Sequence, residues 1–113
     1  MPEEKPIRWM GSSLKDLAAF PDEAKQNAGY QLHRIQNGME PEDWKPFKTA
    51  GPGAKEIRIS GGDGIFRVMY VAKFEKAVYV LHSFQKKTQQ TAKKDIDIAK
   101  ARYQSVVAER NKR

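Results

Sequence analysis

The 113-residue chain contains no cysteine, only two histidines and no long apolar run. Without cysteine there is neither a disulfide framework nor a thiol nucleophile, and His33 and His82 alone do not make a zinc-binding set. Residues 68–72 form an apolar run of five residues and no run is longer, whereas a membrane-spanning helix needs about 20. We therefore expect a protein of the reducing cytoplasm, with no membrane partner, metal or cofactor.

Several sequence motifs are also missing. Residues 1–9 carry acids where a secretory signal peptide needs basic charge, so we expect no export signal. There is no GxSxG, no glycine-rich loop leading into a helix and no paired carboxylates at a strand end, so most hydrolases, kinases and oxidoreductases lack support. The length fits one domain, residues 1–113.

Positive charge is concentrated near the C-terminus. The chain has 21 basic and 14 acidic residues, and residues 84–113 alone hold nine basic against three acidic side chains, a net charge of +6. Such a segment is typical of proteins that meet phosphates or an acidic partner. A lysine-rich helix exposed only to solvent is the other interpretation.

The N-terminal part has two helical patterns. Residues 11–21 predict a short helix with Ser12 or Ser13 as its N-cap and a stop at Pro21. Its expected apolar face comprises Leu14, Leu17 and Ala18. Residues 22–38 predict a longer helix that ends at an Asn-Gly pair and packs against the first as a hairpin. Its expected apolar face comprises Ala24, Ala28, Leu32 and Ile35.

The middle of the chain has a strand pattern. Residues 39–54, with three prolines and two glycines, predict an irregular connection. Residues 55–60, 65–74 and 78–84 predict an antiparallel meander with turns at 61–64 and 75–77. Its last two strands are apolar on both parities, so we expect them to be central, and residues 6–9 can add an edge strand.

The last element is a helix at about residues 92–109, capped by Thr91. Its expected apolar face comprises Ile96, Ala99, Tyr103 and Val106. The predicted fold is therefore a small α+β domain. Two N-terminal helices cover one face of an antiparallel sheet of three to four strands, and the C-terminal helix packs nearby.

Basic residues on the strands are the candidates for chemistry. Arg67 interrupts an apolar strand face and Arg58 interrupts the neighbouring strand, which requires either an anionic ligand or an internal ion pair, for example with Glu56. His82 shares its parity with Val78, Val80 and Phe84, so it is either a hydrogen-bonded core residue or a catalyst. Lys86 and Lys87 leave the last strand where a sheet edge and a helix N-terminus meet, a junction suited to an anion.

These motifs resemble the RelE/ParE superfamily of bacterial toxins. The stretches "WMGSSLKDLAAFP", "KEIRISGGDGIFRVMYVA" and "VYVLHSFQKKTQQTAKKDIDIAKARY" are similar to its phage-derived, HigB-like branch, over roughly residues 7–105. The motif R-x-x-Y at Arg67 and Tyr70, together with L-H-x-F-x-K-K-T at residues 81–88, carries the resemblance.

The resemblance implies a RelE-like fold and the toxin of a type II toxin-antitoxin system, a metal-independent endoribonuclease that cuts mRNA in the ribosome. It also implies a helix-turn-helix antitoxin as partner in a hetero-oligomer. Arg67 matches the family's middle-strand arginine and Lys87 its basic residue after the last strand, while Arg58 and Lys55 match approximately. The tyrosine that some members carry after the last strand has no counterpart in residues 88–94.

RNA cleavage through the 2′-hydroxyl needs a base, an acid and stabilisation of the phosphorane's added negative charge. Clustered cations stabilise that charge, and a lysine crowded by like charges has a lowered pKa and can exchange a proton. We expect the catalytic set to be Arg67, Lys87, Lys86, Arg58 and, in reserve, His82. The expected RNA-binding residues are Lys48, Lys55, Lys93 and Lys94.

Two other functions stay open. A ParE-like inhibitor of DNA gyrase shares the fold but acts by binding, and a basic nucleic-acid-binding module needs no catalysis. For a protein partner, we expect the basic C-terminal helix and the neighbouring sheet edge to form the main contact, because charge complementarity favours an acidic surface there.

Overall fold

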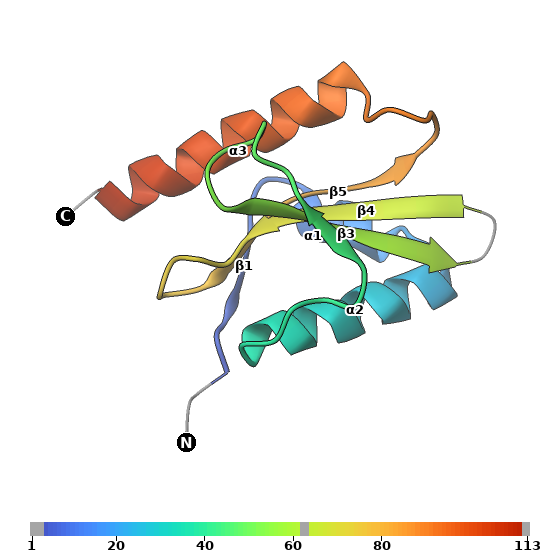
Figure 1. Cartoon of the computed structure of the whole chain (residues 1–113), viewed down its shortest axis with the longest axis horizontal. Coiled ribbons are helices and arrows are strands. Elements are labelled where there is room, and N and C mark those ends of the chain that lie inside the picture. Colours follow the sequence, from blue (N-terminus) through green and yellow to red (C-terminus); the bar gives the residue numbers. More distant parts are fainter. Residues whose placement is uncertain (1–3, 62–63, 112–113) are drawn as a thin grey trace.

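The computed structural model describes residues 4–61 and 64–111. The elements are β1 Ile7–Trp9, α1 Ser13–Ala18, α2 Asp22–Gln36, β2 Trp44–Pro46, β3 Ala54–Gly61, β4 Gly64–Val71, β5 Val78–Lys86 and α3 Lys93–Asn111. One sheet in the order β1-β5-β4-β3-β2 lies between α1 and α2 on one face and α3 on the other (Figure 1). The predicted α+β fold is confirmed. The turn expected at residues 61–64 includes 62 and 63, which lie outside the described residues.

The sheet has more strands than we expected. The meander β3-β4-β5 is antiparallel as predicted, and the expected N-terminal edge strand is present, but β1 pairs in parallel with β5. A fifth strand, β2, lies in residues 39–54, where the sequence predicted only an irregular connection. That prediction was wrong for three residues because proline is tolerated on an edge strand, where its missing N–H costs no ladder bond.

Two apolar layers cover the sheet, one on each face. The first lies under α1 and α2 and comprises Leu17, Phe20, Ala24, Ala28, Leu32, Ile35, Ile57, Ile59, Phe66, Val68, Tyr70, Val78 and Val80. The second lies under α3 and comprises Ala50, Ala54, Met69, Val71, Ala77, Tyr79, Leu81, Phe84, Ala99, Tyr103 and Val106. The α2 face was predicted correctly.

The buried face of α1 differs from the predicted one. Leu14 is 48% exposed and Ala18 is also exposed, so the expected apolar face was wrong for both. Ser13 takes the buried position beside Leu17, and its hydroxyl donates to the Val80 carbonyl at 3.1 Å. A six-residue helix has room for little more than one turn of inward-facing side chains.

The buried face of α3 was also predicted with one error. Asp95, Ala99, Tyr103 and Val106 are buried, whereas Ile96 is only half-buried. The buried stripe thus starts at Asp95 rather than at Ile96, and its successive intervals are four, four and three residues. A carboxylate can occupy that position because it accepts a hydrogen bond from a buried histidine, described below.

A β-bulge in β5 changes the orientation of everything that follows it. Met69 pairs with His82 and Tyr70 with Val80, so Leu81 is an extra residue in the ladder. Beyond the bulge the side-chain parity is reversed. His82 and Phe84 therefore face α3, away from the layer that contains Val78 and Val80. The shared parity that the sequence predicted for these residues was wrong.

Candidate functional site: a charged cluster on the sheet

Three predicted site residues lie together on the α3 side of the sheet. Arg58 of β3 and Arg67 of β4 are direct cross-strand partners, and Phe84 of β5 stands opposite Arg67. Lys86, two residues further along β5, has the same parity as Phe84 and therefore lies on the same face. We call the group formed by Lys45, Arg58, Arg67, Lys86, Asp43 and Glu56 the charged cluster.

Glu56 is the buried centre of the charged cluster. It is fully buried, and its Oε1 lies 3.4 Å from Arg67 Nε and 3.6 Å from Lys45 Nζ. These contacts are ion pairs without aligned hydrogen bonds. Arg67 is 6% exposed, and its Nη1 donates to the Phe66 carbonyl at 3.1 Å. Of the two interpretations of Arg67 that the sequence left open, the internal ion pair is therefore present.

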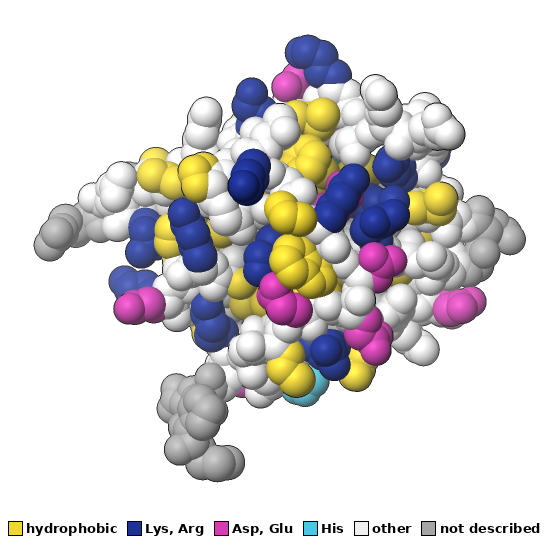
Figure 2. All heavy atoms as spheres, in the orientation of Figure 1, with side chains coloured by type: hydrophobic (Ala, Val, Ile, Leu, Met, Phe, Trp, Pro, Cys, Tyr) yellow, Lys and Arg dark blue, Asp and Glu magenta, His cyan; other side chains and the backbone are white. Residues whose placement is uncertain are grey.

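The ion pairs do not neutralise the cluster. Asp43 Oδ1 lies 3.9 Å from Arg58 Nε, so two carboxylates stand against four cations. Lys45 and Arg58 are exposed and Lys86 is half-buried, so the surplus positive charge lies at the surface. Figure 2 shows lysine and arginine side chains gathered near the middle of one face, with acidic side chains beside them.

The pKa shifts follow from burial and from this excess of cations. Burial lowers the pKa of Arg67, and Glu56 opposes that effect. Burial also lowers the pKa of Lys86, and the nearby Arg67 lowers it further, while Glu56 again acts in the opposite direction. A lysine with a lowered pKa gives up its proton at a lower pH than a free lysine does. The cluster therefore combines positive charge that can stabilise an anion with a lysine that is more easily deprotonated than usual.

A groove opens beside the charged cluster, along the outer edge of β5. This β5-edge groove has a volume of about 830 Å³ and runs between α1 and the start of α3. Lys87 and Lys94 line it, and Lys86 lines it as well, so the groove and the charged cluster meet at Lys86. The groove is thus lined by two lysines that were predicted to be catalytic, Lys86 and Lys87, and by one that was predicted to bind RNA, Lys94.

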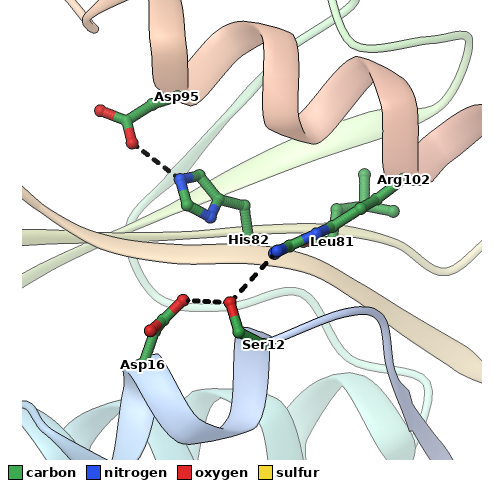
Figure 3. A network of polar contacts seen from close by, with 6 residues as sticks. All are labelled: Ser12, Asp16, Leu81, His82, Asp95 and Arg102. Atoms are coloured by element: carbon green, nitrogen blue, oxygen red, sulfur yellow. Dashed lines mark hydrogen bonds and ion pairs between the residues drawn. The ribbon is translucent and has the colours of Figure 1, made fainter.

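His82 lies in the wall of the groove rather than in the charged cluster. It is 5% exposed, its Nε2 donates to Asp95 Oδ1 at 2.7 Å, and its ring stacks on Phe84 at 4.8 Å between centroids. Its Nδ1 is buried and has no hydrogen-bond partner in the part of the chain that the structure describes. This is the geometry of a hydrogen-bonded core histidine that ties β5 to α3 (Figure 3).

A second set of contacts fixes α1 against α3. Arg102 donates through Nη1 to the Leu81 carbonyl at 3.0 Å and through Nη2 to Ser12 Oγ at 3.1 Å. Ser12 in turn donates to Asp16 Oδ2 at 2.7 Å (Figure 3). These contacts join both walls of the β5-edge groove to the strand between them, so the width of the groove is set by polar contacts.

The remaining predicted RNA-binding residues lie apart from the cluster. Lys55 is on the α2 face, where it donates to both Glu40 carboxylate oxygens at 3.0 and 2.9 Å and lies 4.5 Å from the Trp44 ring centroid. Lys93 is exposed and pairs with Asp97 at 3.0 Å. Lys48 is exposed in the turn after β2, outside the strands that carry the charged cluster.

The sequence did not predict three residues of this region, which are Asp43, Lys45 and Asp95. Lys45 enters the cluster because β2 places it opposite Glu56, and no pattern in the proline-rich segment indicated a strand there. Asp95 could have been predicted from the sequence. It precedes Ala99 by four residues, and Ala99 precedes Tyr103 by four, so the helical spacing of the buried residues extends back to Asp95.

The structure thus defines a small α+β domain whose sheet carries a surplus of positive charge beside an open groove. The chain belongs to the phage-derived Gp49-like protein family (DUF891), whose family model matches residues 15–104. This is a RelE/HigB-like toxin family of toxin-antitoxin systems. The match runs from α1 into α3 and includes the whole charged cluster. No curated protein matched the chain.

Within residues 4–61 and 64–111, no group of three or more His, Asp or Glu side chains is arranged to hold a metal ion. In the same residues, no helix has the length and apolar character needed to cross a membrane.

Proposed function

We propose that the protein is the toxin of a type II toxin-antitoxin pair, of the HigB-like branch, and that it cleaves mRNA in the ribosome. The observation that carries this proposal is the juxtaposition of Arg58, Arg67 and Lys86 on one face of the sheet, together with the lowered pKa of Lys86. Membership of the Gp49-like family supports the same conclusion.

In this mechanism the 2′-hydroxyl of the mRNA attacks the adjacent phosphate and the 5′-oxygen leaves. Arg58, exposed at the rim, contacts the phosphate, and Arg67 beneath it contributes positive charge where the phosphorane gains negative charge. Lys86 exchanges the proton, because its pKa lies below that of a free lysine. His82 is buried and bonded to Asp95, so we give it no part in proton transfer.

The ribosome is needed because the protein supplies few acid and base groups. Tyr70 is 1% exposed, in the layer under α1 and α2, and cannot replace the tyrosine that the resemblance leads one to expect. With one lysine for proton exchange, cleavage depends on a substrate that is already held in the reactive geometry. We therefore expect efficient cleavage of mRNA on ribosomes and poor cleavage of free RNA.

The test combines growth, RNA and gyrase assays on the same variants. Overproduction of the parent should stop growth, and primer extension should show new mRNA ends. Lys86→Gln and Arg58→Gln should abolish both effects while the circular dichroism spectrum stays unchanged. Lys87→Ala belongs in the series because the resemblance assigns the catalytic role to Lys87. Lys25→Gln, an exposed lysine of α2 paired with Asp22, is the matched control and should behave as the parent.

Three results would count against the proposal. Full toxicity of both Lys86→Gln and Arg58→Gln would show that the charged cluster is not the active centre. Rapid cleavage of naked RNA would indicate an ordinary nuclease. Inhibition of DNA supercoiling by gyrase, without new mRNA ends, would show a ParE-like inhibitor instead.

The proposal includes a partner and a compartment. A growth-inhibiting protein needs an antitoxin, which we propose to be a helix-turn-helix protein that binds it in the cytoplasm. The lysines of α3 and of the β5-edge groove are the electrostatic target for an acidic partner.

A further inference from the structure

Each of four adjacent strands contributes one cation to the α3 side of the sheet. The strands β2, β3, β4 and β5 follow one another in the sheet. Lys45 of β2 stands opposite Glu56, which is two residues before Arg58 on β3. Arg58 stands opposite Arg67 of β4, and Lys86 of β5 lies two residues beyond the partner of Arg67. Because side chains two residues apart share a face, the four cations form a line that crosses the strands diagonally.

The diagonal line is longer than one phosphate requires. Neighbouring strands lie about 4.8 Å apart, and residues follow one another at about 3.3 Å along a strand. The line crosses from β2 to β5 and climbs from the level of Glu56 to that of Lys86, so on an ideal flat sheet its two ends lie roughly 20 Å apart. Successive phosphates of one strand in a duplex rise by about 3.4 Å, so the line has room for more than the phosphate that reacts.

Lys45, at the β2 end of the line, is held only loosely. Its Nζ lies 3.6 Å from Glu56 Oε1 without an aligned hydrogen bond, and its side chain is 47% exposed. Arg67 Nε lies 3.4 Å from the same oxygen, and Arg67 is buried. Glu56 therefore keeps a cation when Lys45 turns away. Since ion pairs with an exposed member contribute little to stability, Lys45 can exchange Glu56 for an external anion.

The backbone around Lys45 is fixed although its side chain is exposed. The Arg58 N–H donates to the Asp43 carbonyl at 2.8 Å, and the Phe47 N–H donates to the Ala54 carbonyl at 2.8 Å. These main-chain bonds to β3 lie on either side of residue 45 in the chain. An anion at the edge of the sheet therefore meets a lysine whose Cα position does not have to be ordered on binding, which reduces the entropic cost of the contact.

The charge of Lys45 already acts on the proposed site of cleavage. Burial is the main cause of the lowered pKa of Lys86, and Lys45 is among the cations that lower it further. The acid beside the line, Asp43, has a side chain that is 65% exposed and lies 3.9 Å from Arg58 Nε. One exposed carboxylate thus stands against three cations that reach the surface, Lys45, Arg58 and Lys86.

We propose that Lys45 binds a phosphate of single-stranded RNA next to the phosphate that is cleaved, and so extends the RNA site to the β2 edge of the sheet. The inference rests on the proposed RNA cleavage and adds a residue to it. On binding, Lys45 Nζ leaves Glu56 and donates to the phosphate, while Arg58 contacts the reacting group. Because the phosphate at Lys45 does not react, Lys45 contributes to binding and position and not to the chemical step.

The test uses the full-length protein and a dye-labelled decamer of 2′-O-methyl uridylate, which cannot be cleaved because its 2′-oxygen is blocked. Fluorescence anisotropy gives Kd over a series of salt concentrations. Lys45→Gln should raise Kd about three- to tenfold at low salt and reduce the slope of log Kd against log salt by about 0.7, the value for one contact to a single strand. Lys45→Arg should keep both values. Lys25→Gln, the exposed lysine paired with Asp22, is the matched control and should behave as the parent.

Cleavage on ribosomes separates binding from chemistry. Lys45→Gln should raise the protein concentration for half-maximal mRNA cleavage at least about threefold and leave the rate at saturation within about twofold of the parent. Lys86→Gln should instead lower the rate at saturation. If Lys45→Gln does not fold, resonances of the parent decide. Those of the Lys45 side chain should shift when the 2′-O-methyl RNA is added, and those of Lys25 should not.

Four results would overturn the inference. They are an unchanged salt slope in Lys45→Gln, an equal change in Lys25→Gln, a larger change in Lys55→Gln, which would place the RNA on the α2 face, and a loss of antitoxin binding with RNA binding unaffected. A parent that shows the Lys45-dependent slope but cuts no mRNA would reject RNA cleavage and keep the phosphate site. Cleavage of mRNA with an unaltered slope would reject the role of Lys45 alone, so the two proposals fail separately.

Discussion

Glu56 is the residue whose replacement tests the charged cluster most directly. Glu56→Gln keeps the shape of the side chain and removes the charge that lies 3.4 Å from Arg67 Nε and 3.6 Å from Lys45 Nζ. At 3.4 Å and an effective dielectric constant of about 20, the gross attraction of one such pair is about 5 kcal/mol. The desolvation of the buried charges offsets much of it.

The loss of stability caused by Glu56→Gln depends on how exposed the partners of Glu56 are. Removal of one member of a buried ion pair costs about 3–5 kcal/mol. Because Lys45 is exposed and can turn to solvent, we expect the lower end, a loss of about 3 kcal/mol in the free energy of unfolding. For a domain of this size that corresponds to a fall in Tm of roughly 12 °C.

The assay is urea unfolding at neutral pH of Glu56→Gln, Arg67→Gln and the double variant. Because both single changes break the same contact, the double variant should be more stable than the sum of the two predicts, by about 2 kcal/mol. Asp43→Asn is the control, since its exposed pair with Arg58 at 3.9 Å should contribute less than about 1 kcal/mol.

Two results would refute this account of Glu56. Additivity of the single changes to within about 0.5 kcal/mol would show that Glu56 and Arg67 do not stabilise each other. If Glu56→Gln were no less stable than Asp43→Asn, the buried ion pair of Glu56 would contribute no more to stability than the exposed pair of Asp43.

Four further predictions concern Lys86, the bond between His82 and Asp95, and the lysines of α3. Glu56→Gln should lower the pKa of Lys86 further, because the carboxylate raises it; a ¹⁵N titration of the Lys86 ammonium measures this, and an unchanged pKa would contradict it. Since the folded-state pKa of Lys86 lies below the ordinary lysine value of 10.5, stability should rise with pH between the two values, and Lys86→Gln should remove that part of the rise. Asp95→Asn, which weakens the 2.7 Å bond to His82, should cost about 1.5–3 kcal/mol in urea unfolding, whereas Asp97→Asn on the exposed face of α3 should cost less than about 0.5 kcal/mol; equal losses would show that the buried bond contributes nothing. The association rate of the cognate antitoxin in stopped-flow mixing should fall as salt rises, and fall less steeply when three α3 lysines are changed to Gln (Lys93, Lys94 and Lys100); a salt-independent rate would place the partner elsewhere.

The sequence predicts the helices and the meander because their periodicity is regular. Ala24, Ala28, Leu32 and Ile35 repeat at helical spacing, and all four are buried in α2. The same method fails at β2, because a three-residue strand that ends in proline has no periodicity to detect. The strand pattern does place Arg58 and Arg67 on neighbouring strands. Their direct pairing depends on the register of the hairpin, and the four-residue glycine-rich turn predicted from the sequence does not fix that register.

The bulge at Leu81 explains the largest difference between the site that the sequence predicts and the site in the structure. In a regular β5, side-chain parity would place Lys87 on the face of Arg67 and turn Lys86 to the other side. The inserted residue reverses which face each side chain takes. Lys86 therefore joins the charged cluster, while Lys87 lies just beyond the strand and lines the groove. The same insertion turns His82 toward Asp95. Bulges are set by local backbone geometry and leave no signature in apolar periodicity, so a residue matched by sequence position alone can lie on the wrong face of the strand. On the basis of this register we propose Lys86, the last residue of β5, rather than Lys87 as the basic partner of Arg67.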